Sequence, residues 1–127
     1  MRRWLWPVGA AVLAGLWAEP FRVDVSGGSM APGLRDGDWL IATRRGRIRR
    51  GAVVVLAHPG RTLDLVKRVA AVPGDRVSGG TLGPDEFLVV GDNQAASTDG
   101  REFGPVRADA IEGIVRFRYW PHPGPVR

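Results

Sequence analysis

From residue 20 onward, short apolar runs alternate with turns rich in glycine, proline and aspartate. Short runs that alternate or carry many β-branched side chains indicate strands rather than helices. The expected strands cover Val23–Val25, Trp39–Thr43, Ala52–Ala57, Leu63–Val72, Phe87–Val90 and Ile111–Trp120. The pattern predicts a mostly β fold, with a compact antiparallel, barrel-like sheet in a single domain over residues 20–127.

A different pattern precedes this region. Arg2 and Arg3 are followed by the apolar run Trp4–Ala18. Its 15 residues would span about 22 Å as a helix, against about 30 Å for a hydrocarbon core, so the flanking arginines would have to snorkel. We favour a retained transmembrane anchor over residues 1–19. A cleaved signal peptide and a buried or amphipathic helix are the alternatives, although Leu16–Ala18 lacks the small first residue of a cleavage site.

Composition narrows the possible chemistry. The 127 residues suffice for one core, and without cysteine neither a disulfide framework nor a thiolate metal site is available. The two histidines, His58 and His122, lie far apart beside prolines, so we expect no metal and no cofactor. The net charge of +5 is carried almost wholly by arginine, because Lys67 is the only lysine.

Five arginines gather in the segment Arg44–Arg50, between two expected strands. We interpret it as a solvated hairpin loop. As an alternative function for the chain, the loop would bind anionic lipid or an acidic partner, because each basic residue near a membrane contributes about 1 kcal/mol. The alternative function is therefore a non-catalytic basic β module that binds anionic membrane or nucleic acid through Arg44–Arg50. Nucleic acid is not the expected partner, since no known motif accompanies the charge.

Ser29 is the candidate nucleophile. Gly27 and Gly28 precede it and allow close approach of the backbone, while Pro32 stiffens the exit of the turn. The sequence around Ser29 does not match the G-x-S-x-G nucleophile elbow, because Ala31 occupies the place of the last glycine. A serine in a glycine turn needs a base before catalysis can be argued.

Lys67 is a candidate for that base. It lies in the expected strand Leu63–Val72, where alternation places it on one side with Leu65 and Val69. Burial disfavours the ammonium, so a pKa lowered from about 10.4 toward 7–8 would leave a neutral amine as general base. A lysine that snorkels from an edge strand is the structural alternative.

Three blocks together resemble the successive boxes of the signal peptidase I family, which comprises membrane-anchored Ser/Lys endopeptidases. They are GGSMAPGLRDGD (27–38), VKRVAAVPGD (66–75) and VVGDNQAASTDGREFGPV (89–106). The terminal IEGIVRFRYWP (111–121) is also similar to that family. The resemblance covers nearly the whole chain after Pro20.

The resemblance implies roles for the residues that match. It makes Ser29 the nucleophile, Lys67 the general base, and the Ser29 N–H one donor to the oxyanion. The other implied residues support these two: Met30 and Pro32 shape the turn, Ser97 orients the lysine, and Asp99 and Arg101 form a structural ion pair. The implied partners are a precursor protein bound as an extended strand and membrane lipid. The implied location is a single-pass cell-membrane protein with a cytoplasmic N-terminus and an extracytoplasmic catalytic domain near the membrane surface.

Two departures from the family pattern matter. Gly27 stands where some members have a serine whose hydroxyl completes the oxyanion hole, so a second donor must come from the backbone or the hole is weaker. Housekeeping members usually insert a second β subdomain, for which the stretch from Lys67 to Gly91 leaves no room. The compact form resembles the mitochondrial inner-membrane peptidase and the bacterial nickel superoxide dismutase maturation protease.

Overall fold

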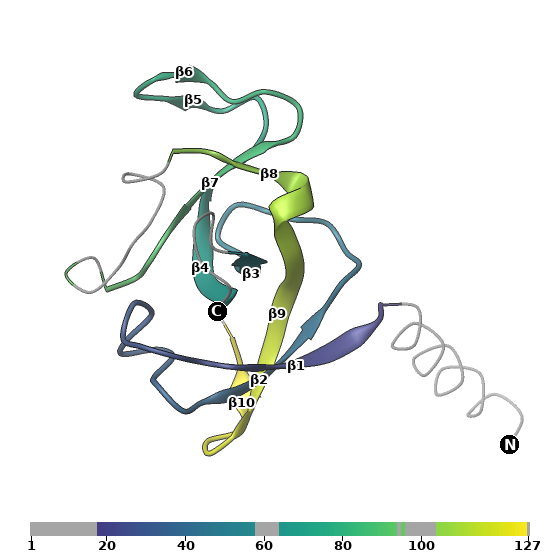
Figure 1. Ribbon diagram of the computed structural model, residues 1–127, viewed down its shortest axis with the longest axis vertical. Helices are drawn as coiled ribbons and strands as arrows, with labels where there is room; N and C mark the ends of the chain where they lie inside the picture. The colour runs from purple at the N-terminus through teal and green to yellow at the C-terminus, as the bar shows by residue number, and fades with distance from the viewer. Residues whose placement is uncertain (1–17, 58–63, 94, 96–103, 127) are drawn as a thin grey trace, which may run out of the picture.

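The computed structural model describes residues 18–57, 64–93, 95 and 104–126 (Figure 1). The strands are β1 (Pro20–Asp24), β2 (Trp39–Thr43), β3 (Val53–Ala57), β4 (Asp64–Ala71), β5 (Arg76–Val77), β6 (Gly80–Thr81), β7 (Glu86–Val90), β8 (Val106–Arg107), β9 (Ile111–Trp120) and β10 (Gly124–Pro125), with one 3-10 turn, η3 (Ala108–Ala110).

All strand pairs are antiparallel. The main sheet has the order β1-β2-β9-β3-β4-β7-β8, with β10 added to β9, and β5 and β6 form a separate hairpin. Strand β9 runs through the centre of the molecule in Figure 1 and pairs with both β2 and β3. The predicted mostly β, antiparallel fold is confirmed. Within the described residues no pairing joins β1 to β8, so the path of strands is open.

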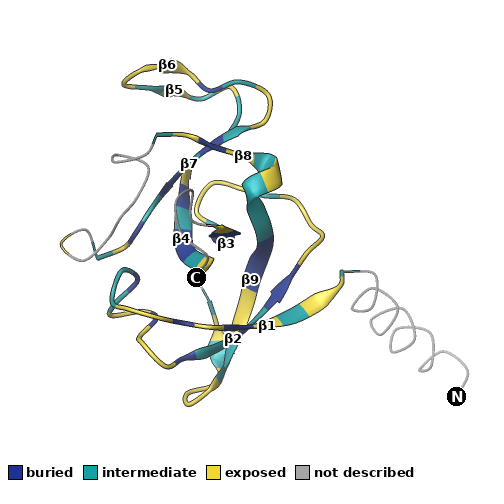
Figure 2. Ribbon diagram, viewed as in Figure 1, coloured by how far each residue is buried: buried dark blue, intermediate teal, exposed yellow. Residues whose placement is uncertain are grey.

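The sheet is buried on both sides at β3, as its unbroken apolar run requires. Val53 and Val55 belong to one core cluster, here called the first cluster, whose other buried members are Val23, Val25, Met30, Leu34, Leu40, Ala42, Val66 and Val115. Val54 and Leu56 belong to the second cluster, with Val69, Phe87, Val89, Val106 and Ile114. The buried middle of β3, β4 and β9 is dark blue in Figure 2.

Between β4 and β7 the chain forms only the short β5–β6 hairpin, which stands apart at the top of Figure 1. Gly74, with φ of +88°, begins this excursion in a conformation that favours glycine. There is therefore no second β subdomain between β4 and β7, as the spacing from Lys67 to Gly91 predicted.

No helix in the described ranges is long and apolar enough to cross a membrane. The anchor predicted over residues 1–19 falls outside the described residues except for Ala18 and Glu19. Those two residues lead into β1 and are held against the segment after β2. The Ala18 carbonyl accepts a hydrogen bond from the Arg45 N–H at 3.2 Å, and the Glu19 carbonyl accepts one from the Arg44 N–H at 3.2 Å.

Candidate active site

Ser29 lies half-buried in a tight turn between β1 and β2. The Ala31 N–H donates to the Gly28 carbonyl at 3.2 Å, and the Leu34 N–H donates to the Met30 carbonyl at 3.0 Å. Met30 is 1% exposed and belongs to the first cluster, so its side chain fixes the turn to the core. The turn that holds Ser29 is thus anchored in the core by its neighbour Met30.

The two glycines before Ser29 differ in the hydrogen bonding of their N–H groups. Gly27 adopts φ of +85°, a left-handed conformation, and its N–H donates to the Asp36 carboxylate at 2.8 Å. The N–H groups of Gly28 and Ser29 make no hydrogen bond within the described part of the chain. Two successive backbone donors therefore remain available beside Ser29, whereas the Gly27 donor is already used.

Lys67 is among the most buried side chains of the described protein, with 1% of its surface exposed. It lies on β4 opposite Val54, and strand alternation puts it on the same face as Val69, in the second cluster. No buried side-chain nitrogen or oxygen in the described residues lacks a hydrogen-bonding partner, so the amine is not an unsatisfied group. The alternative of a snorkelling edge-strand lysine is therefore wrong, because β4 is an internal strand and its lysine is enclosed.

One dipeptide in the loop after β7, Asp92-Asn93, ties the Ser29 turn to the strand that carries Lys67. The Asn93 N–H donates to the Ser29 carbonyl at 2.7 Å, and the Asn93 side-chain amide donates to the Gly28 carbonyl at 3.0 Å. The Asp92 carboxylate accepts two hydrogen bonds of 2.8 Å from Arg68, the residue next to Lys67. The Ser29 turn and the strand that carries Lys67 are thus both bonded to the same loop.

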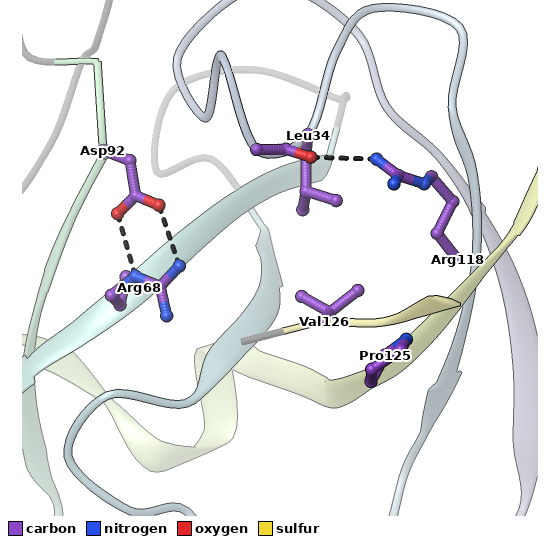
Figure 3. Close-up of a pocket in the computed structure, with 7 residues that line it drawn as sticks. Leu34, Arg68, Asp92, Arg118, Pro125 and Val126 are labelled. Atoms are coloured by element: carbon purple, nitrogen blue, oxygen red, sulfur yellow. Dashed lines mark hydrogen bonds and ion pairs between the residues drawn. The ribbon is translucent and has the colours of Figure 1, made fainter. Parts of the chain in front are cut away.

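The Arg68–Asp92 pair is a fork of two parallel bonds, a geometry that only arginine provides. Arg68 also donates to the Gly51 carbonyl at 2.8 Å. The hydrogen bond with Asp92 raises the pKa of Arg68, and burial offsets part of that rise. Figure 3 shows this ion pair on one side of a cavity of about 220 Å³, with Leu34 and Arg118 on the other and Val126 between them.

A second groove, of about 420 Å³, lies between β1 and the start of β4. Its lining includes β1 residues from Phe21 to Asp24, then Ser26, and Asp64 at the start of β4. In the described structure β1 pairs only with β2, and β7 pairs with β4 only from Arg68 onward. The edge of β1 that faces away from β2 has no partner strand in the described residues, and β1 borders a groove that reaches to within three residues of Ser29.

The charged residues that line this groove include Glu112 of β9. Burial raises the pKa of Glu112, and the neighbouring carboxyl of Asp64 raises it further, while Arg44 partly opposes the shift. Arg44 also stacks over Phe21, with 4.3 Å between the guanidinium carbon and the ring centroid.

Several predicted site residues lie outside the described residues: Ser97, Asp99 and Arg101. Pro32 is in the turn as predicted and is exposed. Ser29 and Lys67 are both placed, but no hydrogen bond joins them in the described structure. Nucleophile–base contacts of proteases often tighten only when substrate is bound. Sequence reasoning missed Arg68, Asp92 and Asn93, although the charged neighbour of Lys67 and the Gly-Asp-Asn spelling were visible signals.

The described structure adds little support for a metal site or for binding through the segment Arg44–Arg50. No three His, Asp or Glu side chains come together as metal ligands in the ranges that the structure covers. In the segment Arg44–Arg50, Arg45 pairs with Glu19 at 3.6 Å and Arg50 pairs with Asp75 at 2.8 Å. Part of that loop's charge is thus used within the protein.

Comparison with known proteins gives the family. The family model described as "Signal peptidase, peptidase S26" matches residues 2–82 and 78–120. Signal peptidase I of Bacillus caldolyticus is 33% identical over 94% of this chain and 91% of its own length. Signal peptidase IB of Staphylococcus aureus strain Mu50 is 29% identical over 76% of each chain, and that of strain COL is 28% identical over the same share. Since the model and the Bacillus relative cover almost the entire sequence, this protein belongs to the signal peptidase family, peptidase S26.

Proposed function

We propose that this member of the family is a serine endopeptidase in which Ser29 is the nucleophile and Lys67 the general base. The burial of Lys67 carries the proposal. The chain has one lysine, and it is enclosed in the core beside a residue fixed to the loop that holds Ser29. An enclosed ammonium is costly, so burial favours the neutral amine that a base requires.

The reaction then follows Ser-Lys chemistry. Ser29 Oγ attacks the scissile carbonyl carbon while its proton passes to the Lys67 amine, and the carbonyl π pair moves onto oxygen. The oxyanion accepts a hydrogen bond from the Ser29 N–H. The C–N bond breaks as the Lys67 ammonium returns the proton to the leaving amine. Water then hydrolyses the acyl-enzyme ester, again with Lys67 as base. We assign Ser97 to orienting Lys67, and Asp99 with Arg101 to supporting that region.

The substrate fits the groove between β1 and β4 as an extended strand. An added strand would pair with the open edge of β1 through backbone hydrogen bonds, which give affinity with little demand on sequence. The groove passes Ser26, so the scissile carbonyl of a peptide bound along it would reach Ser29. We infer a precursor protein that is cut near its N-terminus, after a small residue.

We also propose that residues 1–19 anchor the enzyme in the cell membrane, with the catalytic domain outside the cytoplasm. Ala18 is fixed against Arg45 at the start of the sheet, and Ser29 follows it within about 40 Å of extended chain. Cleavage would then occur close to the membrane surface, where membrane-bound precursors present their processing sites.

The test is cleavage of two precursors by the full chain in lipid vesicles: a secretory precursor and the nickel superoxide dismutase precursor. We expect the wild type to release a new N-terminus from one of them and Ser29→Ala to release none. The sequenced product identifies the substrate class, because both remain open. Equal cleavage by wild type and Ser29→Ala would exclude Ser29 as nucleophile. Absence of cleavage with charge-dependent vesicle binding through Arg47 and Arg49 would favour a basic membrane-binding module.

A further inference from the structure

The peptide group between Gly28 and Ser29 is held by the side chain of Asn93. Its carbonyl oxygen accepts the Asn93 side-chain amide at 3.0 Å, and also the Ala31 N–H at 3.2 Å. In a trans peptide the carbonyl and the N–H point in opposite directions. Fixing the Gly28 carbonyl therefore fixes the direction of the Ser29 N–H, which has no acceptor of its own in the described structure.

This constraint matters because the backbone before Ser29 can rotate. Gly27 and Gly28 have no Cβ atoms, and a Cβ added at Gly27 would meet nothing within 4 Å. The Gly28–Ser29 peptide group rotates through ψ of Gly28 and φ of Ser29, and glycine lowers the steric cost of the first rotation. The next peptide group is held separately, since the Asn93 backbone N–H donates to the Ser29 carbonyl at 2.7 Å. Asn93 therefore holds the peptide groups on both sides of Ser29.

The loop that carries Asn93 is itself anchored at two points. Asp92 is joined to Arg68 by two bonds of 2.8 Å, and the Asp92 N–H lies 3.5 Å from the sulfur of Met30. The Asn93 amide thus acts from a fixed support. Its contacts reach across 65 positions of the sequence, so they are tertiary and not part of the turn itself.

We propose that Asn93 is a positioning residue that orients the Ser29 N–H as the oxyanion donor. The inference rests on the proposed function and extends it. Gly27 carries no hydroxyl and its own N–H is bound to Asp36, so the oxyanion hole depends on the next backbone donors, of which Asn93 aligns the Ser29 N–H. Losing one direct donor typically lowers kcat by 10²- to 10³-fold. Loss of the Asn93 contact would only loosen the Ser29 N–H, because the contact of the Gly28 carbonyl with the Ala31 N–H remains. We therefore expect a smaller fall in kcat, about 10- to 100-fold.

The experiment compares wild type, Asn93→Ala and Asn93→Asp as full chains in vesicles, with the precursor that the wild type cleaves. Both variants keep the Asn93 backbone N–H, and the second is nearly isosteric but cannot donate when ionised. We expect kcat to fall about 10- to 100-fold with KM within twofold, because an oxyanion donor acts in the transition state. A peptide aldehyde, which forms a tetrahedral adduct on Ser29, should bind correspondingly weaker. The cleaved peptide should bind as before.

Three results would overturn the inference. One is a kcat within twofold of wild type in both variants. Another is an equal loss of affinity for the aldehyde and the cleaved peptide, which would mean a distorted site. The third is a shifted pH profile at unchanged aldehyde affinity, which would mean that Asn93 acts through Lys67. If a variant has a lower melting temperature but an unchanged kcat per folded molecule, this counts as the first result and also overturns the inference. An inactive wild type would contradict the proposed function as well, whereas an active wild type with normal Asn93 variants contradicts this inference alone.

Discussion

The backbone at Gly27 combines a left-handed φ of +85° with open space around the position of a Cβ. A side chain there would be strained but would clash with nothing. Some members of the signal peptidase I family carry a serine at this place, which makes Gly27 the residue at which the oxyanion hole can be probed by addition rather than by removal.

Gly27→Ser should therefore be compared with Gly27→Ala. Both variants pay the cost of a left-handed conformation, about 1 kcal/mol of unfolding free energy, which denaturant unfolding measures. Only the serine adds a donor, so its kcat should exceed that of the alanine variant by about tenfold or more. Equal kcat values in the two variants would show that no donor acts from this position.

At the scale of elements, β9 owes its contact with β1 to a missing side chain. A Cβ at Gly113 would lie 2.6 Å from the Phe21 ring and 2.8 Å from the Thr43 carbonyl oxygen, which is backbone and cannot move away easily. We expect Gly113→Ala to lower the unfolding free energy by about 1–3 kcal/mol. Gly124→Ala is the matched control in β10, because its Cβ would meet nothing within 4 Å. Similar stability of the two variants in chemical denaturation would contradict this packing.

The carboxyl pair between β4 and β9 predicts how stability changes with pH. Burial and Asp64 raise the pKa of Glu112 in the folded protein. Between the pKa of the unfolded chain and this raised pKa, the folded protein therefore keeps a proton on Glu112 that the unfolded chain has released. Stability is therefore lost as pH rises through the raised value. Glu112→Gln should have a melting temperature like that of wild type near pH 4 and a relatively higher one near pH 7. A difference between the two proteins that does not change with pH would contradict this assignment.

For the whole molecule, the sequence predicted the long strands better than the site. Runs such as Trp39–Thr43 and Ile111–Trp120 carry enough residues for their apolar pattern to be recognised. In the structure they are strands β2 and β9, with the same bounds. The two-residue strands β5, β6, β8 and β10 were not predicted, because two residues show no periodicity.

The site was predictable only in part. Ser29 and Lys67 stood out by local context and family resemblance. Strand alternation placed Lys67 on an apolar face but left a snorkelling edge-strand lysine as an alternative to burial. The support around them did not stand out, because it is formed by contacts between distant positions. Arg68 and Asp92 are 24 residues apart, and Asn93 is 65 residues from Gly28. No local pattern contains such a pairing.

The central claim is that Lys67 acts as a neutral base toward Ser29. Its most direct test is precursor cleavage by Lys67→Arg, measured from about pH 6 to 9, where a lysine of lowered pKa titrates. Arginine keeps the charge but cannot release its proton, and Lys67→Met, which keeps an apolar stem, controls for folding in thermal denaturation. We predict wild-type cleavage that rises with pH, and no cleavage by either folded variant at any pH. Cleavage by Lys67→Arg at the wild-type rate, or a flat wild-type profile, would contradict the account.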